Sequence, residues 1–289
     1  MTLTKSAHSR RQLFRKLKSD VMVGLTVLAT ALALVPLFLV LGYLVSKGAT
    51  SVNWSFFTRM PAPVGQSGGG MANAIVGTFE LVGLACALGV PIGVAAGIYL
   101  AENRGGALAQ AIRFSADVMM GVPSIVVGIF CYATVVRPFG GFSTLAGAIA
   151  LAVIMVPLVT RTAEEMILLV PHELREAALA LGVPRWRTSL LIVARTAASG
   201  IATGVILAIA RVAGETAPLL FTAFGNRFWS TSLLQPISSL TMQVYTYAIS
   251  PFADWQRQAW AGALVLTAIV LALEIGVRWL TRGDAQVAR

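Results

Sequence analysis

Charged side chains inside apolar stretches are the first candidates for chemistry in this sequence. Arg211 stands within an apolar run at 196–220, and Glu215 follows four residues later. A charge at the centre of a bilayer is costly and usually faces a protein interior or a wet cavity. The planar guanidinium of arginine can bind an oxyanion through two hydrogen bonds. Arg211 is therefore a candidate for an anion pathway, with a structural ion pair between helices as the alternative. Glu215 would share its helix face and act as a gate or ion-pair partner, because a carboxylate repels an anion.

Three further polar residues are candidates for the same pathway. Arg161 is expected at the inner end of the fourth apolar run, where it would receive the anion or serve as a positive anchor. Glu80 lies within the second run and would either pair with Arg211 or reach toward the headgroups. Ser124 follows the helix-disrupting Pro123 and would offer a hydroxyl to the anion or bond a neighbouring helix.

The elements that must position these residues are membrane-spanning helices. The chain has 289 residues, 57% of them hydrophobic and 12% charged, and a mean hydropathy of +0.79, which is too apolar for a soluble domain. None of the long apolar runs alternates with the period of a barrel strand. We therefore predict an all-α polytopic membrane protein with six transmembrane helices, at residues 21–45, 74–100, 116–136, 142–160, 196–220 and 258–281.

The positive charges predict the orientation of these helices. With the N-terminus inside, 16 of the 22 Lys and Arg residues fall on inner segments and five on outer segments. Inner loops carry the excess of positive charge in membrane proteins. Both termini are therefore expected in the cytoplasm. The net charge of +10 indicates attraction to membrane lipid rather than binding of nucleic acid.

The spacing of the runs suggests one main domain with an extra helix before it. A loop rich in Gly and Pro separates the first run from the other five. The expected organisation is a basic cytoplasmic tail at 1–20, a first helix at 21–45, an outer loop at 46–73, a transmembrane domain at 74–281 and a cytoplasmic tail at 282–289.

A charged inner segment at 171–191 interrupts the apolar pattern. Its first part has one small apolar face at helical spacing, formed by Leu174, Ala177, Ala178 and Leu181. Gly182 is a suitable stop because glycine tolerates the left-handed conformation after a helix, and a second helix is predicted from about Arg185. A short rigid helix of this kind suits docking to a partner, and an ordinary interfacial helix is the alternative.

The sequence lacks the motifs that would make the chain an enzyme. It contains no GxxxxGK[ST], so it has no P-loop for ATP, and neither HExxH nor GxSxG occurs. Cys86 and Cys131 fall within apolar runs without a Cys/His grouping. We expect no metal and no cofactor, and any energy source must lie in another subunit.

Several motifs resemble a known family. The segment EAALALG at 176–182 is similar to the signature of permease subunits of ATP-binding-cassette importers, although Ala194-Arg195 replaces the usual Leu-Pro at its end. The segments at 121–130, 161–166 and 209–231 resemble permeases of the phosphate-specific importer. The resemblance implies a type I importer permease fold with a cytoplasmic coupling helix. It implies that Glu176, Ala177, Ala178 and Gly182 couple the chain to an ATPase.

The resemblance also implies the partners and the place of the protein. We expect a homologous permease subunit as heterodimer partner, two ATPase subunits, an external phosphate-binding protein, and the bacterial inner membrane as location. Another oxyanion, such as phosphonate, sulfate or molybdate, is the alternative substrate. An ion-driven secondary transporter would need inverted repeats, which the sequence lacks, and a scaffold without transport would tolerate loss of Arg211.

Overall fold

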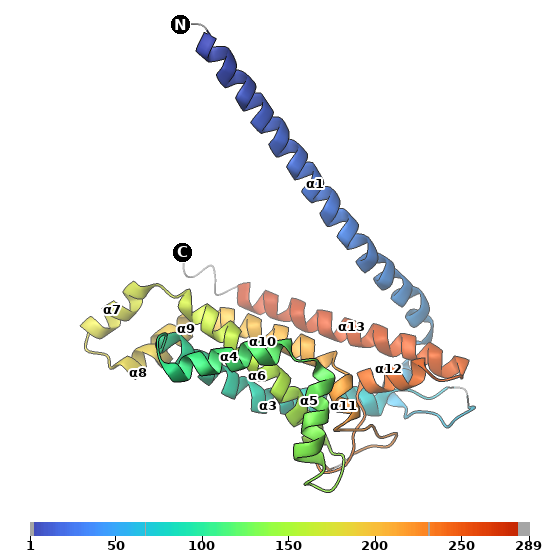
Figure 1. Ribbon diagram of the computed structural model, residues 1–289. Coiled ribbons are helices and arrows are strands. Elements are labelled where there is room, and N and C mark those ends of the chain that lie inside the picture. Colours follow the sequence, from blue (N-terminus) through green and yellow to red (C-terminus); the bar gives the residue numbers. More distant parts are fainter. Residues whose placement is uncertain (1–2, 67, 231, 283–289) are drawn as a thin grey trace.

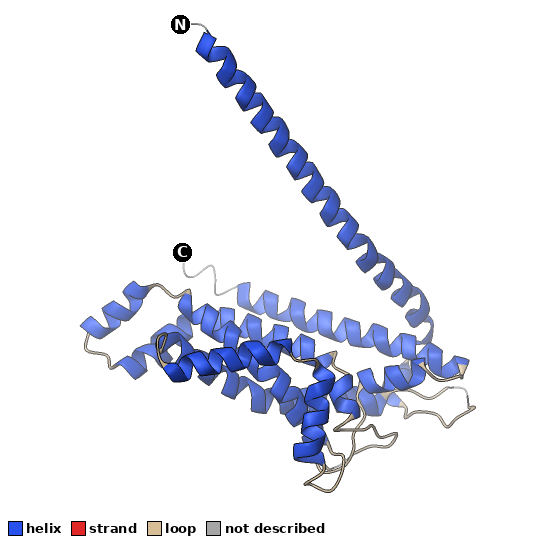
Figure 2. Cartoon of the chain, in the orientation of Figure 1, coloured by secondary structure: helices blue, strands red, loops and turns tan. Residues whose placement is uncertain are grey.

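Helices form nearly the whole of this chain, because backbone polar groups in lipid must find partners within their own segment. The computed structural model describes residues 3–66, 68–230 and 232–282, and that part contains helices and loops but no strand (Figure 2). The helices are α1 (Leu3–Gly48), η1 (Ala49–Ser51), α2 (Trp54–Thr58), α3 (Ala72–Glu102), α4 (Ala107–Gly121), α5 (Ser124–Cys131), η2 (Tyr132–Val136), α6 (Thr144–Leu168), α7 (His172–Ala180), α8 (Arg185–Arg187), η3 (Thr188–Val193), α9 (Ala194–Thr196), α10 (Ala198–Ala213), α11 (Ala217–Leu220), α12 (Leu240–Ala248) and α13 (Ala253–Arg282).

Six spans are obtained when two bent helix pairs are counted as one span each. Four continuous helices are long and apolar enough to cross a membrane, within α1, α3, α6 and α13. The bent pairs are Ala107–Gly121 with Ser124–Val136, at 106°, and Arg185–Thr196 with Ala198–Ala213, at 69°. The single helix that we predicted at 116–136 is therefore wrong in shape, and the helix predicted at 196–220 ends early, at Ala213. The count of six is consistent with the structure.

Local backbone explains both bends. At the first, Val122 and Pro123 both adopt extended ψ values, of 130° and 135°, as expected where a proline excludes the helical conformation of its predecessor. At the second, the π-helical turn η3 and the short helix α9 precede Ala197, which is the N-cap of α10. A π-helical turn disturbs the regular backbone ladder and often accompanies a kink.

Small residues bring α3 and α6 into close contact. A Cβ added at Gly93 would lie 2.7 Å from Val159 Cβ, and one at Gly97 would lie 2.6 Å from Ala163 Cβ. The constant offset between partners means that the two helices run in the same direction. Glycines let helix backbones approach in membranes, where van der Waals contact replaces the hydrophobic effect as the driving force.

Helix α10 packs on another side of α6 and runs in the opposite direction. Gly200 lies against Met166, and Gly204 lies against Thr162. Figure 1 shows α3, α6, α10 and α13 side by side, with α5 leaving the bundle steeply and α7 and α8 standing clear of one end. The bundle core therefore consists of α3, α6 and α10, and the polar residues on these helices have defined depths.

Helix α1 stands apart from the bundle (Figure 1). Its apolar window is not buried at all, and it meets α13 only near its end, where the rings of Tyr43 and Trp260 are 5.2 Å apart. The expected tail at 1–20 and first helix at 21–45 form one continuous helix from Leu3 onward. Residues 1–2 and 283–289 of the expected tails lie outside the described part of the chain.

Candidate functional site: an arginine pathway and a coupling segment

Arg211 lies in the last turn of α10, close to the point where this span breaks. Its side chain is exposed on the isolated chain, and it forms no ion pair with any other side chain that the structure describes. The helix resumes only at Ala217 as α11. Arg211 thus presents a guanidinium beside an unwound stretch of backbone, within the segment that crosses the membrane.

Glu215 does not share a helix face with Arg211, so that expectation is wrong. Helix α10 ends at Ala213, and Glu215 lies in the break that follows. The break comes before Pro218, which starts the next short helix rather than bending the first. The carbonyl oxygen of Glu215 accepts a hydrogen bond of 3.0 Å from Thr241 Oγ1, so the break is held against α12.

The helix register gives the depth of the two pathway arginines. Gly204 lies opposite Thr162, and seven residues further along α10 Arg211 lies at about the level of Met155 on the antiparallel α6. Arg161 is therefore about 9 Å nearer the end of α6 that leads to α7, at a rise of 1.5 Å per residue. The two arginines lie at successive depths and do not share one site.

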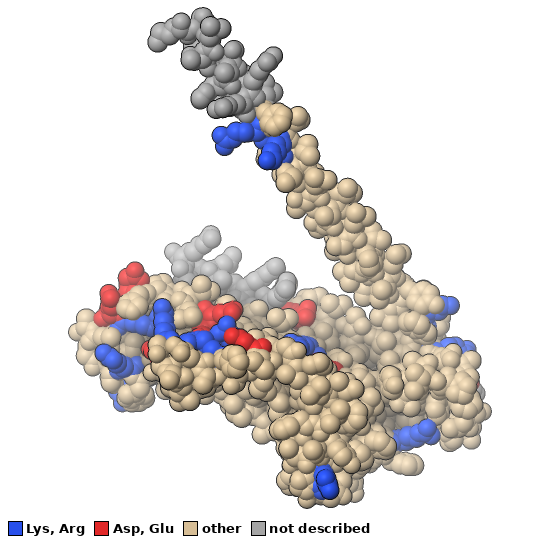
Figure 3. Space-filling model, viewed as in Figure 1, with Lys and Arg blue, Asp and Glu red and all other residues tan. Residues whose placement is uncertain are grey.

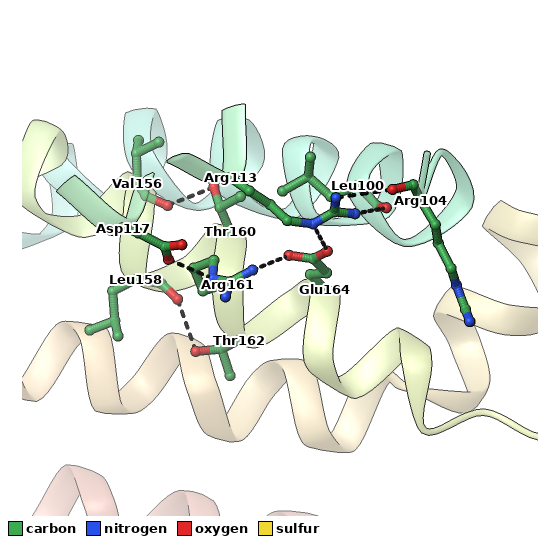
Figure 4. A network of polar contacts seen from close by, with 10 residues as sticks. All are labelled: Leu100, Arg104, Arg113, Asp117, Val156, Leu158, Thr160, Arg161, Thr162 and Glu164. Carbon is green, nitrogen blue, oxygen red and sulfur yellow. Dashed lines mark hydrogen bonds and ion pairs between the residues drawn. The ribbon is translucent and has the colours of Figure 1, made fainter. Parts of the chain in front are cut away.

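Four charged side chains form a network toward the end of the bundle that carries α7 (Figure 4). Glu164 is its centre, with a side chain that is 3% exposed. Arg113 Nε donates to Glu164 Oε1 at 2.6 Å, and Arg161 Nη1 donates to Glu164 Oε2 at 2.7 Å. Arg161 Nε also pairs with Asp117 Oδ1 at 3.0 Å. Two carboxylates and two guanidiniums balance in charge, so the network can stay partly buried.

Sequence reasoning misplaced or missed parts of this network. Arg161 does not end its span, because α6 continues to Leu168, and its guanidinium is engaged by two carboxylates. Asp117, Glu164 and Arg113 are not among the residues that the sequence singles out. The spacing of three between Arg161 and Glu164 was an available signal, since such residues face each other on a helix.

Glu80 lies away from Arg211, and Ser124 lies at a bend. The parallel register of α3 and α6 places Glu80 beside Ala146, roughly 13 Å from the level of Arg211 in the direction away from α7. No ion pair joins Glu80 to another described residue. Ser124 is the first residue of α5, directly after the 106° bend, and its side chain is half-buried. The structure therefore brings together Arg161 and Glu164 but not the five expected pathway residues.

The inner segment forms the short helix that its sequence predicts. Helix α7 ends in a left-handed glycine, with Gly182 at φ +77°. The Gly182 N–H donates to Leu179 O at 3.0 Å and the Val183 N–H donates to Ala178 O at 3.1 Å, which is the Schellman arrangement. This double hydrogen bond fixes the direction in which the chain leaves α7.

The apolar face of α7 is largely uncovered. Leu174 is 40% exposed and Leu181 84% exposed, and Ala177 is also exposed, whereas Ala178 is buried at 4%. The Glu176 side chain is exposed, and its Oε1 lies 3.2 Å from His172 Nδ1. In the space-filling view, charged side chains of both signs gather at the end that carries α7 and α8, while the middle of the bundle is nearly free of them (Figure 3). An exposed apolar face bordered by charges suits docking of a soluble protein.

Among the described residues, no group of three or more His, Cys, Asp or Glu side chains could hold a metal ion.

The fold, a helical bundle from which the short helix α7 projects, matches the class of membrane permease subunits. The profile of the binding-protein-dependent transport system inner membrane component matches residues 89–283. Solved structures share the fold at low identity. A bacterial alginate ABC transporter chain superposes with a TM-score of 0.67 at 13% identity, over 94% of this chain and 98% of that chain. A chain of the inward-facing MetNI methionine ABC transporter gives 0.60 at 17% identity, over 74% and 96%.

Curated relatives are far more similar in sequence. The phosphate transport system permease protein PstA of Yersinia pestis is 47% identical over 270 residues, which cover 93% of this chain and 92% of the relative. The PstA of Haemophilus influenzae is 45% identical, over 95% and 97%. The probable PstA of Methanocaldococcus jannaschii is 34% identical, over 96% and 99%. This chain belongs to the family of binding-protein-dependent transport system inner membrane components, in the group of the PstA permeases.

Proposed function

We propose that this chain is the permease subunit of an ATP-driven importer that moves inorganic phosphate across the cytoplasmic membrane of a bacterium. The observation that carries the proposal is the glycine-terminated helix α7, which stands clear of a bundle of spans similar in sequence to phosphate transport system permease proteins. The chain itself has no P-loop, so ATP hydrolysis belongs to a separate subunit.

The surfaces that the isolated chain leaves open support the following assembly. A homologous permease subunit covers the exposed side of Arg211 and completes the pathway. Two ATPase subunits lie beneath, and Glu176, Ala177, Ala178 and Gly182 couple one of them to the spans. A soluble phosphate-binding protein delivers the anion outside, and both termini lie in the cytoplasm.

Arg211 lowers the barrier to the anion within the membrane. Phosphate carries one to two negative charges and must exchange its water for fixed donors, which a guanidinium supplies in pairs. Arg161 lies about 9 Å further inward and acts as the next positive charge or as part of the inner gate. Glu215, Glu80 and Ser124 line or gate the path at other depths.

The proposal is tested by ATP-dependent phosphate uptake into proteoliposomes that hold the full complex. Arg211→Gln should reduce uptake by about 10- to 100-fold, as expected for loss of a charge-assisted hydrogen-bond donor, with assembly and ATP turnover intact. The matched control is Arg137→Gln, which changes an exposed arginine outside the proposed path. Unchanged uptake by Arg211→Gln would mean that Arg211 is a structural charge with no role in the pathway.

The same assay tests the alternative substrates and the alternative energy source. Phosphonate, sulfate or molybdate that competes with labelled phosphate at equal concentration would indicate a broader oxyanion permease. Uptake that needs an ion gradient but no ATP would indicate a secondary transporter.

A further inference from the structure

Arg175 differs from the other charged residues of α7 in where its side chain lies. The His172 and Glu176 side chains are 71% and 70% exposed, whereas the Arg175 side chain is 12% exposed. Arg175 Nη2 donates to Glu102 Oε1 at 3.3 Å and to Ile167 O at 3.3 Å. The other charged residues of α7 thus face the surrounding solution, and Arg175 faces the bundle.

The two partners of Arg175 belong to different spans. Glu102 is the last residue of α3, and Ile167 is in the last turn of α6. One guanidinium therefore joins α7 to the inner ends of two helices. Those helices are in backbone contact along their length through Gly93 and Gly97, so that they must move together.

The inner end of α3 is also held from its other side. Arg113 of α4 donates to Leu100 O at 2.8 Å through Nη2, to Arg104 O at 3.2 Å through Nη1, and to Glu164 through Nε. An unbroken series of contacts thus runs from Arg175 through the end of α3 and through Arg113 to Glu164. It ends at Arg161, which shares the Glu164 carboxylate.

Apolar packing attaches α7 elsewhere. Helix α7 packs against the π-helical turn η3, which leads into α9 and α10. The apolar cluster at this end of the bundle contains Ala101, Ile167 and Val193, but none of the described residues of α7 belongs to it. Arg175 is thus the side chain of α7 whose hydrogen bonds reach both α3 and α6.

We propose that Arg175 is a positioning residue that transmits movement of α7 to the α3–α6 pair through Glu102 and Ile167 O, and so to the charged network around Glu164. This inference rests on the proposed function, because it assumes that an ATPase moves α7. Without the ion pair, α7 can follow the ATPase while α3 and α6 lag behind. ATP is then hydrolysed with less phosphate carried.

The test measures phosphate transported per ATP hydrolysed by the full complex in proteoliposomes, with the binding protein present. Arg175→Gln and Glu102→Gln should each lower this ratio about three- to tenfold, the range for a partly exposed charge-assisted pair, while ATP hydrolysis continues. The reversed pair, Arg175→Glu with Glu102→Arg, should regain part of the ratio. Arg195→Gln is the matched control, because Arg195 is an exposed inner arginine without an ion pair among the described residues.

Two results would overturn the inference. An unchanged ratio in Arg175→Gln and in Glu102→Gln would mean that the ion pair transmits nothing. A parallel loss of ATPase binding and ATP hydrolysis in both variants, with no recovery in the reversed pair, would assign Arg175 to docking instead. A wild-type complex without ATP-dependent phosphate uptake would refute the proposed function itself, which is a separate outcome from either.

Discussion

At the scale of single residues, Glu164 is the most constrained charge in the described bundle. Its carboxylate is nearly buried and accepts hydrogen bonds from Arg113 and Arg161. Removing one member of such a group leaves the other charges without compensation, which costs more than the group contributes when whole. We expect Glu164→Gln to lower the free energy of unfolding by about 1–3 kcal/mol.

This effect is measured as the melting temperature of the purified permease complex in detergent. Glu165→Gln is the control, because Glu165 is the next residue, is exposed and has no ion pair among the described residues. Equal melting temperatures for the two variants would contradict the structural role of the network.

Some residues of the candidate site could be predicted from the sequence, and others could not. Arg211 stood out because a charge within an apolar run is rare whatever the fold. The partner that Arg161 has on another helix could not be found in the same way, since Asp117 approaches it from α4, and pairing between helices depends on tertiary packing. The wrong placement of Glu215 followed from extending one helix through Gly214, where the backbone in fact leaves the helix.

At the scale of elements, the contact between α3 and α6 depends on glycine. A Cβ at Gly97 would lie 2.7 Å from the carbonyl oxygen of Thr160, so even Gly97→Ala must push the helices apart. We expect a loss of about 1–3 kcal/mol in the free energy of unfolding. Gly83→Ala is the control on the same helix, because that position meets nothing within 4 Å, and alanine is there expected to be neutral or stabilising.

Both variants are compared by melting temperature and by the yield of assembled permease complex. A Gly97→Ala variant as stable as Gly83→Ala would mean that α3 and α6 lie further apart than the structure places them.

The end of α7 also depends on a glycine, but for a conformational reason. Gly182 has φ +77°, where a side chain costs about 1 kcal/mol and asparagine less than alanine. Gly182→Ala should therefore displace the end of α7 and reduce ATP-driven uptake more than Gly182→Asn does. The comparison is made at equal amounts of assembled complex. A greater loss in the asparagine variant would contradict the backbone argument.

The sequence predicted these elements unevenly. The stop at Gly182 was predicted correctly because a C-terminal glycine followed by proline is a local signal. The 106° bend at Pro123 was not predicted. The apolar run at 116–136 continues through the proline, and hydropathy alone does not show where a helix changes direction.

At the scale of the whole molecule, the placement of charge predicts which end faces the cytoplasm. The inner segments carry most of the Lys and Arg residues, and the charged side chains gather at the end with α7 and α8 (Figure 3). Positive charge is retained on the inner side during membrane insertion.

With Cys86 and Cys131 replaced by alanine, we expect Gln66→Cys to react with a membrane-impermeant maleimide in intact spheroplasts. Arg187→Cys should react only after the membrane is opened, because α8 would lie in the cytoplasm. Both positions are exposed on the isolated chain, so access depends on the side of the membrane. The reverse pattern would invert the topology and place the exposed face of α7 where no ATPase could reach it.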